Sequence, residues 1–148
     1  AMSLTNIGVI YHWQGDYTQA IESQSKSLKI YEELGDKKGI SYSLINIGNI
    51  YRDQNDYTKA IDYYTRSLKL IEEVGDKDGI ATSLNNIAFI YIEQGDYAKA
   101  YKYSLQSLTI AQEIGAALRI KEAASNLWVI NKKLGHYKES LEIYELYI

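Results

Sequence analysis

Residues 17–21 read Tyr-Thr-Gln-Ala-Ile, and the same pattern returns at residues 57–61 as Tyr-Thr-Lys-Ala-Ile. It returns again at residues 97–101 as Tyr-Ala-Lys-Ala-Tyr and, more weakly, at residues 137–141 as Tyr-Lys-Glu-Ser-Leu. The spacing is forty residues each time, and no insertion interrupts it. A fixed period of this length indicates an array of supersecondary units, none of which buries its apolar face alone. The repeat therefore predicts a fold built by stacking similar units.

Within one period, the apolar residues follow helical spacing. Leu44, Ile47, Gly48 and Tyr51 lie at i, i+3, i+4 and i+7, which places them on one stripe of a helix. We expect a second helix whose inner face carries Tyr57, Ala60, Ile61, Tyr64, Ser67, Leu68 and Ile71. Each unit should therefore be a pair of antiparallel helices, each about 15–18 residues long.

The boundaries between these helices carry recognisable signals. Asp56 is placed to cap the N-terminus of the second helix, and Gly75 suits the left-handed residue that follows a helix. Asp76 should cap the next helix, and residues 35–36 repeat this arrangement one period earlier. Ala116 stands where a capping side chain is expected, so we predict a looser helix start there.

These residues resemble the tetratricopeptide repeat (TPR) family. The family pattern has a small residue in the first helix, then an aromatic, then a Gly-Asp-Tyr turn, then an alanine. Here the matching positions are Gly8, Gly48 and Ala88; Tyr11, Tyr51 and Tyr91; residues 15–17 and 95–97; and Ala20, Ala60 and Ala100. The usual unit has 34 residues, and the longer unit here is similar to the repeats of kinesin light chains, LGN-type adaptors, bacterial Rap-type regulators and arrays beside bacterial sensors.

The resemblance implies an all-α fold, a right-handed α-solenoid (TPR superhelix) of antiparallel helix pairs. One array would span residues 1–148, with repeats at about 1–36, 37–76, 77–116 and 117–148. The fourth copy departs from the pattern, because Trp128 replaces the small residue and Asn131 replaces the tyrosine. We expect the Trp128 indole to push its two helices apart or to redirect their packing.

Comparison of the four copies separates the expected core from the expected surface. Three positions are identical in all copies: Ile10, Ile50, Ile90 and Ile130; Tyr17, Tyr57, Tyr97 and Tyr137; and Asn6, Asn46, Asn86 and Asn126. The isoleucines and tyrosines are interpreted as core and turn anchors. The asparagines lie beside the apolar stripe, at the edge of the exposed face.

In TPR arrays the first helices line a concave groove, so the resemblance implies a ladder of asparagines along it. An amide both donates and accepts hydrogen bonds, and it can therefore hold a peptide backbone. The alternative is that each asparagine bonds to a neighbouring helix and fixes the orientation of the repeats. Other groove positions vary between copies, as a specificity surface would: Val9, Asn49 and Phe89; His12, Arg52 and Ile92; Trp13 and Tyr42. Trp13 could instead pack against a preceding repeat.

Composition narrows the class of function. The net charge is −3, without the basic stripe of a nucleic-acid binder, and there are no cysteines for disulfides or thiolate metal sites. No apolar run approaches the ~18 residues of a membrane span. The two histidines, His12 and His136, lie more than three periods apart, and no catalytic motif is present. We expect a cytoplasmic protein that is not an enzyme, with no cofactor, no metal, no nucleic acid and no membrane contact.

The sequence thus predicts a protein-interaction module that binds a protein or peptide ligand in the concave groove. We expect it to be the regulatory or sensor part of a longer signalling protein. One alternative is self-assembly into a homo-oligomer through open terminal helices. A further alternative is a receptor domain for a peptide pheromone.

Overall fold

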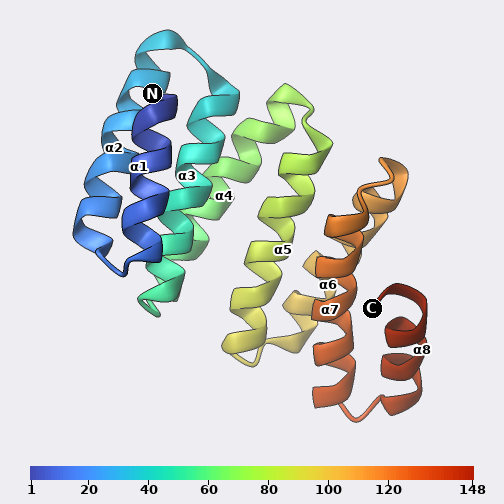
Figure 1. Ribbon diagram of the computed structural model, residues 1–148. Helices are drawn as coiled ribbons and strands as arrows, with labels where there is room; N and C mark the ends of the chain where they lie inside the picture. The colour runs from blue at the N-terminus through green and yellow to red at the C-terminus, as the bar shows by residue number, and fades with distance from the viewer. The chain divides into compact units, whose positions relative to one another are not determined.

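A computed structural model describes residues 1–148 and contains eight helices and no strand. The chain forms two compact units, Ala1–Val74 and Gly75–Ile148. Unit 1 holds α1 (Met2–Trp13), α2 (Tyr17–Leu34), α3 (Lys37–Asp53) and α4 (Tyr57–Val74). Unit 2 holds α5 (Lys77–Glu93), α6 (Tyr97–Glu113), α7 (Ala117–Lys133) and α8 (Tyr137–Tyr147). The all-α class and the antiparallel helix pairs of each unit are confirmed (Figure 1).

The short connections between the helices follow the expected chemistry. Gly35 and Gly75 adopt φ values of 66° and 76°, in the left-handed region that favours glycine. Asn55 takes the same conformation, with φ 60°, at the turn position where the other copies have glycine. Asparagine is one of the few other residues that tolerate this region.

Aspartates cap the helices as predicted. The carboxylates of Asp16, Asp36, Asp56, Asp76 and Asp96 each accept a hydrogen bond from the backbone N–H three residues later. Ala116 supplies no such bond. Its backbone nevertheless keeps φ −81° and ψ 86°, close to the −80° and 87° of Asp36, so α7 begins in the usual place without its cap.

The core of unit 1 lies between α3 and its neighbours α2 and α4. Leu44, Ile47 and Ile50 on α3 and Tyr64 and Ile71 on α4 are almost completely buried. The expectation that all four repeated isoleucines are core anchors is wrong for Ile10, which is 51% exposed. Ile10 lies on α1, which packs mainly on α2 and only slightly on α3, so less of its surface is covered.

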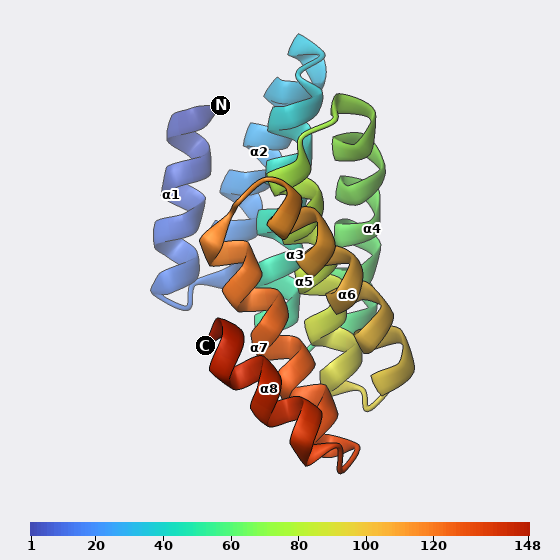
Figure 2. The ribbon, with the colours of Figure 1, turned by 90° about the vertical axis from the view of Figure 1, so that its right-hand side faces the viewer.

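The core of unit 2 has the same construction on α5 and α7. Leu84, Ile87 and Ile90 on α5 and Leu127 and Ile130 on α7 are buried. α8 lies against α7 (Figure 2) and buries only Ser140 fully. Tyr137, which was expected to anchor the last turn, is 70% exposed, and this prediction is wrong.

Trp128 is half-buried between α7 and α8. Its ring centroid lies 6.3 Å from that of Tyr144 with the rings tilted by 47°, and the ammonium group of Lys132 lies 5.0 Å from the indole. The indole therefore packs towards the side of α8 and is not enclosed in the interior of the pair.

None of the helices is both long and apolar enough to cross a lipid bilayer.

A buried serine on each of three second helices bonds to the first helix of its own pair. The hydroxyl of Ser67 donates to the backbone carbonyl of Ser41 at 2.9 Å, and that of Ser107 donates to the carbonyl of Ala81 at 2.9 Å. Ser27 makes the equivalent bond to Ala1 at 3.1 Å. The predicted close approach of the helices at Ser67 is confirmed, since all three serines are fully buried.

Candidate functional site: the first-helix faces

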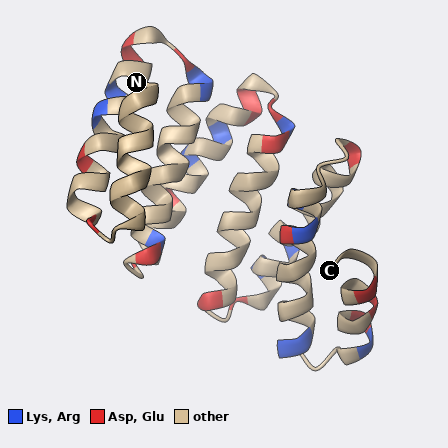
Figure 3. Ribbon diagram, viewed as in Figure 1, with Lys and Arg blue, Asp and Glu red and all other residues tan.

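The predicted binding surface lies on the first helix of each pair. α1 neighbours α3 within unit 1, and α5 neighbours α7 within unit 2. The charged residues of α3 and α5 lie only at their two ends, and the central turns carry none (Figure 3). A ligand on these central turns would therefore meet amide, apolar and aromatic side chains.

The four repeated asparagines have different environments. Asn46 donates from Nδ2 to Oε1 of Gln24 at 3.5 Å, and Asn126 donates from Nδ2 to the backbone carbonyl of Asn85 at 3.3 Å. These two amides link neighbouring helices, as the structural alternative expected. Asn6 is exposed and Asn86 is half-buried, and neither side chain makes a hydrogen bond. A ligand-binding role for these asparagines stays a prediction.

Two predicted groove residues of unit 1 converge on one carboxylate. His12 Nε2 lies 2.8 Å from Asp53 Oδ2, and Arg52 Nε donates to Asp53 Oδ1 at 2.8 Å. Partial burial acts to raise the pKa of Asp53, but the hydrogen bonds and charges of Arg52 and His12 outweigh it and hold the pKa below its ordinary value. The carboxylate therefore stays ionised and joins the end of α3 to α1.

A residue of the second helix reaches the first-helix face of unit 1. The hydroxyl of Tyr64 on α4 donates to Oδ1 of Asn49 at 2.7 Å. Its ring lies directly against Gly48, where a Cβ atom would come within 2.6 Å of the ring. Asn49, which was predicted to face a ligand, thus has one of its amide atoms bound within the fold.

Tyr64 should give the protein a distinct alkaline transition. Burial raises the pKa of its phenol from the ordinary 10.0, although the nearby Arg52 acts in the opposite direction. The folded state thus holds the proton more tightly than the unfolded state. The contribution of the Tyr64 phenol to the free energy of unfolding is fully present below about pH 10. It is lost as the pH rises through the folded pKa, by up to about 1.4 kcal/mol per pH unit.

Urea unfolding between pH 9 and pH 11.5 would measure this loss. We expect Tyr64→Phe to flatten the dependence of the unfolding free energy on pH. Tyr63→Phe controls for the removal of one hydroxyl from the same helix. If it flattened the curve equally, the assignment to Tyr64 would be wrong.

The face of unit 2 combines exposed apolar groups with a polar network. Phe89 is 39% exposed and Ile92 is half-buried, both on α5. Arg119 of α7 donates to Asp78 at 3.1 Å and to Glu122 at 2.9 Å. Asn85 donates from Nδ2 to Glu122 at 3.5 Å. This network holds α5 beside α7, and Phe89 adds exposed aromatic surface to the same first helix.

The remaining predicted residues lie on unit 1. Trp13 is 82% exposed at the end of α1, and Val9 is half-buried one turn earlier. Tyr42 is half-buried on α3, with the Lys38 ammonium 5.8 Å from its ring. The exposure of Trp13 suits either of the two interpretations of this residue, contact with a ligand or packing against a preceding repeat.

Sequence reasoning placed Tyr64 on the inner face of its helix but missed its effect on the first-helix face, and it did not consider Gln24. Gln24 on α2 and Tyr64 on α4 stand at the same repeat position, and each lies against the small residue of its partner helix, Gly8 or Gly48. The side chain of Gln24 is buried and donates to the carbonyl of Thr5 at 3.0 Å. The sequence contains a signal for these contacts, because the two copies with a large residue at this position have glycine in the first helix. The third copy has the small Ser104 there, and it has Ala88 in place of the glycine.

Known proteins share this fold. Aspartyl phosphate phosphatase F from Bacillus subtilis matches with a TM-score of 0.91 and 16% identity over 96% of this chain and 37% of its own. A Rap protein complexed with Competence and Sporulation Factor matches with a TM-score of 0.86 and 20% identity over 96% of this chain and 40% of its own. The chain thus spans about two fifths of each of these two proteins.

A further match is the putative kinesin light chain of Podosopora anserina, which has nearly identical TPR-like repeats. Its TM-score is 0.75 and its identity 14%, over 97% of this chain and 71% of its own. No curated protein sequence matches this chain. The model of a protein family described as "Tetratricopeptide repeat" matches residues 1–73 and 79–148. With both units covered, this chain belongs to the tetratricopeptide repeat family.

Proposed function

We propose that this chain binds a segment of another protein on its first-helix faces, mainly through amide and aromatic side chains. The coarse class rests on family membership, because tetratricopeptide repeats commonly mediate protein–protein interactions and are generally not enzymes. One of the structurally similar proteins, a Rap protein, is complexed with Competence and Sporulation Factor. A regulatory place in a longer signalling protein would agree with this resemblance.

One observation on unit 2 carries the finer proposal. On α5, the unbonded amide of Asn86 lies one turn before Phe89, in a stretch without charged residues. The amide offers a donor and an acceptor to a peptide backbone, and the exposed ring offers apolar area. Asn46 and Asn126 serve the fold by contrast, because their amides bond to neighbouring helices.

Peptide selection from a random library displayed on phage, with the whole chain as bait, would test this proposal. We expect Asn86→Ala and Phe89→Ala to weaken binding of a selected peptide about tenfold or more, without a large change in unfolding free energy. Gln106→Ala alters an exposed amide on α6 and should leave binding unchanged. Asn126→Ala should act mainly on stability, through its lost bond to α5.

Fluorescence anisotropy would give the affinities, and urea unfolding would give the stabilities. If peptides enriched on the chain bound equally well to the Asn86→Ala and Phe89→Ala variants, the proposal for this face would be wrong. Loss of stability in Asn86→Ala would assign that amide to the fold instead.

Self-association is the second candidate, and exposed apolar residues on α8 favour it. Leu141, Tyr144 and Leu146 are each more than half exposed. A second copy could cover this surface. Light scattering over a concentration series would detect it, and a constant monomer mass at the highest concentration would remove this candidate.

A further inference from the structure

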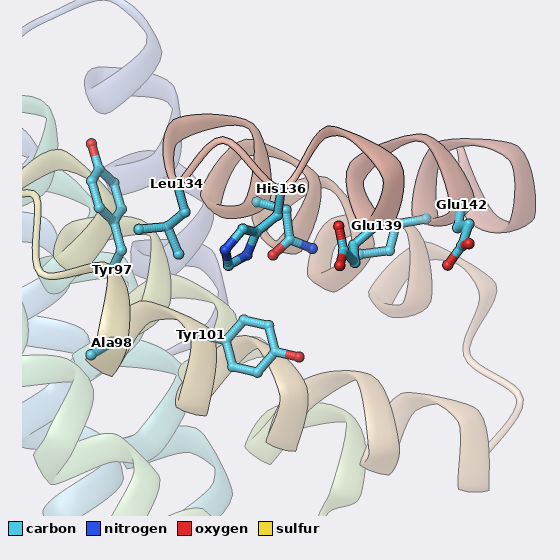
Figure 4. Close-up of a pocket in the computed structure, with 9 residues that line it drawn as sticks. Tyr97, Ala98, Tyr101, Leu134, His136, Glu139 and Glu142 are labelled. Carbon is cyan, nitrogen blue, oxygen red and sulfur yellow. The ribbon is translucent and has the colours of Figure 1, made fainter.

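An open cavity on unit 2 is lined by none of the predicted groove residues. It has a volume of about 580 Å³ and is lined by residues of α6, the end of α7 and the start of α8. Figure 4 shows Tyr101 of α6 on one side, opposite His136 and Glu139 on the other. Glu142 lies one turn further along α8.

The same place in the second and third copies is filled by a cluster of side chains. In the third copy, Tyr91 and Tyr103 stack with centroids 5.7 Å apart, and the ammonium group of Lys99 lies 5.1 Å from the Tyr91 ring. Lys99 is also paired with Asp96 at 2.9 Å. The second copy repeats this arrangement with Tyr51, Tyr63, Lys59 and Asp56. Each of these clusters therefore contains its own cation over an aromatic ring.

The fourth copy replaces all four members of the cluster. Asn131 and Ile143 stand in place of the two tyrosines, and their smaller side chains leave space. Glu139 stands in place of the lysine, and His136 in place of the aspartate. The charge at the lysine position is thus inverted, and no lysine or arginine lines the cavity.

A polar side chain without a hydrogen-bond partner in the chain lines this cavity. Asn131 is only 5% exposed, and its side-chain amide makes no hydrogen bond within the chain. Its amide atoms reach the solvent of the open cavity, where they are available to a ligand or to water. Two carboxylates, a carboxamide oxygen and the Tyr101 ring together match the needs of an organic cation, which pairs with carboxylates and lies over aromatic faces.

From this arrangement we infer that the cavity between α6 and α8 binds an organic cation, a guanidinium or ammonium group, with Glu139 and Glu142 as the anionic partners. The Asn131 carboxamide accepts a hydrogen bond from the cation, and Tyr101 presents its ring. This site is separate from the proposed first-helix surface and does not depend on it. The cation belongs either to an arginine or lysine side chain of a partner protein or to a free small molecule.

NMR titration of the ¹⁵N-labelled chain would test the site with two peptides, acetyl-Gly-Arg-Gly-amide and its citrulline counterpart. Citrulline has nearly the shape of arginine without the charge. We expect the arginine peptide to shift the Asn131 side-chain amide and the backbone amides of residues 139–143 saturably. The citrulline peptide should bind at least about tenfold more weakly, since a charge-assisted hydrogen bond is lost. Equal binding of the two peptides would overturn the inference.

Variants assign the site to the named residues. Glu139→Gln combined with Glu142→Gln should weaken the arginine peptide about tenfold or more, and both positions are exposed, so the fold should tolerate the change. Glu145→Gln removes an exposed acid of α8 that does not line the cavity, and it should leave the affinity unchanged. An equal loss in both would show a general charge effect and overturn the site.

A filling variant and a small probe complete the design. Asn131→Tyr combined with Ile143→Tyr gives the fourth copy the pair of rings found in the third copy. This variant should abolish the NMR shifts of residues 139–143 that the arginine peptide causes, provided that circular dichroism shows a folded chain. Retained binding in a folded filled variant would overturn the inference. Methylguanidinium distinguishes the source: affinity equal to that of the peptide supports a free small cation, and weaker affinity supports a protein side chain.

Discussion

Replacing Gly48 with alanine will lower the free energy of unfolding by about 2 kcal/mol, although alanine is the better helix former. The added Cβ would come within 2.6 Å of Cε1 and 2.8 Å of Cδ1 of Tyr64. Tyr64 is completely buried, and its hydroxyl is held by Asn49 at 2.7 Å, so the ring has little room to move away. Overpacking typically costs about 1–3 kcal/mol, and a ring that is held in place should reach the upper end of this range, about 3 kcal/mol. The gain in helix propensity offsets about 1 kcal/mol of this cost.

The sign of this effect should reverse when Tyr64 is replaced by serine. Tyr64→Ser removes the ring and is itself strongly destabilising, because it leaves a cavity in the core of unit 1. In that background Gly48→Ala should stabilise by about 1 kcal/mol, since the added methyl meets no ring and the helix loses a glycine. The combined variant reproduces the pair found in the third copy, Ala88 opposite Ser104.

A double-mutant cycle by urea unfolding would measure the coupling, which we expect to be about 3 kcal/mol. Ala88→Gly is the matched control, because it makes the reverse change opposite Ser104 and should destabilise by about 1 kcal/mol. Additive effects of Gly48→Ala and Tyr64→Ser on the free energy of unfolding would show that the two positions are not coupled, which would contradict this prediction.

Replacing Ile90 with alanine will destabilise the protein by about 3 kcal/mol, whereas Ile10→Ala will cost less than about 1 kcal/mol. The two residues occupy the same position of the repeat and are chemically identical. Ile90 is fully buried in unit 2, and Ile10 is 51% exposed on α1. The cost of removing methyl groups depends on the apolar area that they bury and on the cavity left behind, and both are smaller at the half-exposed Ile10.

Thermal and urea unfolding of the two variants would give this difference. Ile130→Ala is the control for a second buried copy in unit 2 and should resemble Ile90→Ala. A cost at Ile10 as large as that at Ile90 would mean that α1 is covered in solution, for example by a second copy of the chain. Light scattering of the wild-type protein would then be the next measurement.

The helix pairs could be predicted from the sequence because their signals are local. The carboxylates that cap helices, such as Asp56, and the left-handed glycines, such as Gly75, act on residues close to them in the chain. Ala116 shows the limit of this reasoning. Its missing cap was predicted correctly, but the looser helix start was not, because its backbone angles match those of the capping Asp36.

The details of the surface depend on contacts between helices, and a repeat pattern does not report these. Four identical asparagines were treated alike, yet Asn46 and Asn126 bond to neighbouring helices and Asn86 does not. The partner of Asn46 is the side chain of Gln24, which is not repeated in the other copies, and that of Asn126 is a backbone carbonyl. The cavity at Asn131 was missed for a related reason, because the substitution was considered alone and not together with Ile143.

The buried serine bonds bear on how such a chain can lengthen during evolution. Each bond joins residues 26 apart, and the lysine–glutamate pairs at 37–73 and 77–113 join residues 36 apart. The two residues of every such pair therefore lie within forty consecutive residues of the sequence, the length of one repeat. A gene segment that encodes one period therefore carries both partners of every such link, and its tandem duplication adds a hairpin that is already complete in these bonds. A new copy thus begins with these bonds and can lose them later, as in the fourth copy, where Tyr147 stands at the serine position and Ala117 at the lysine position.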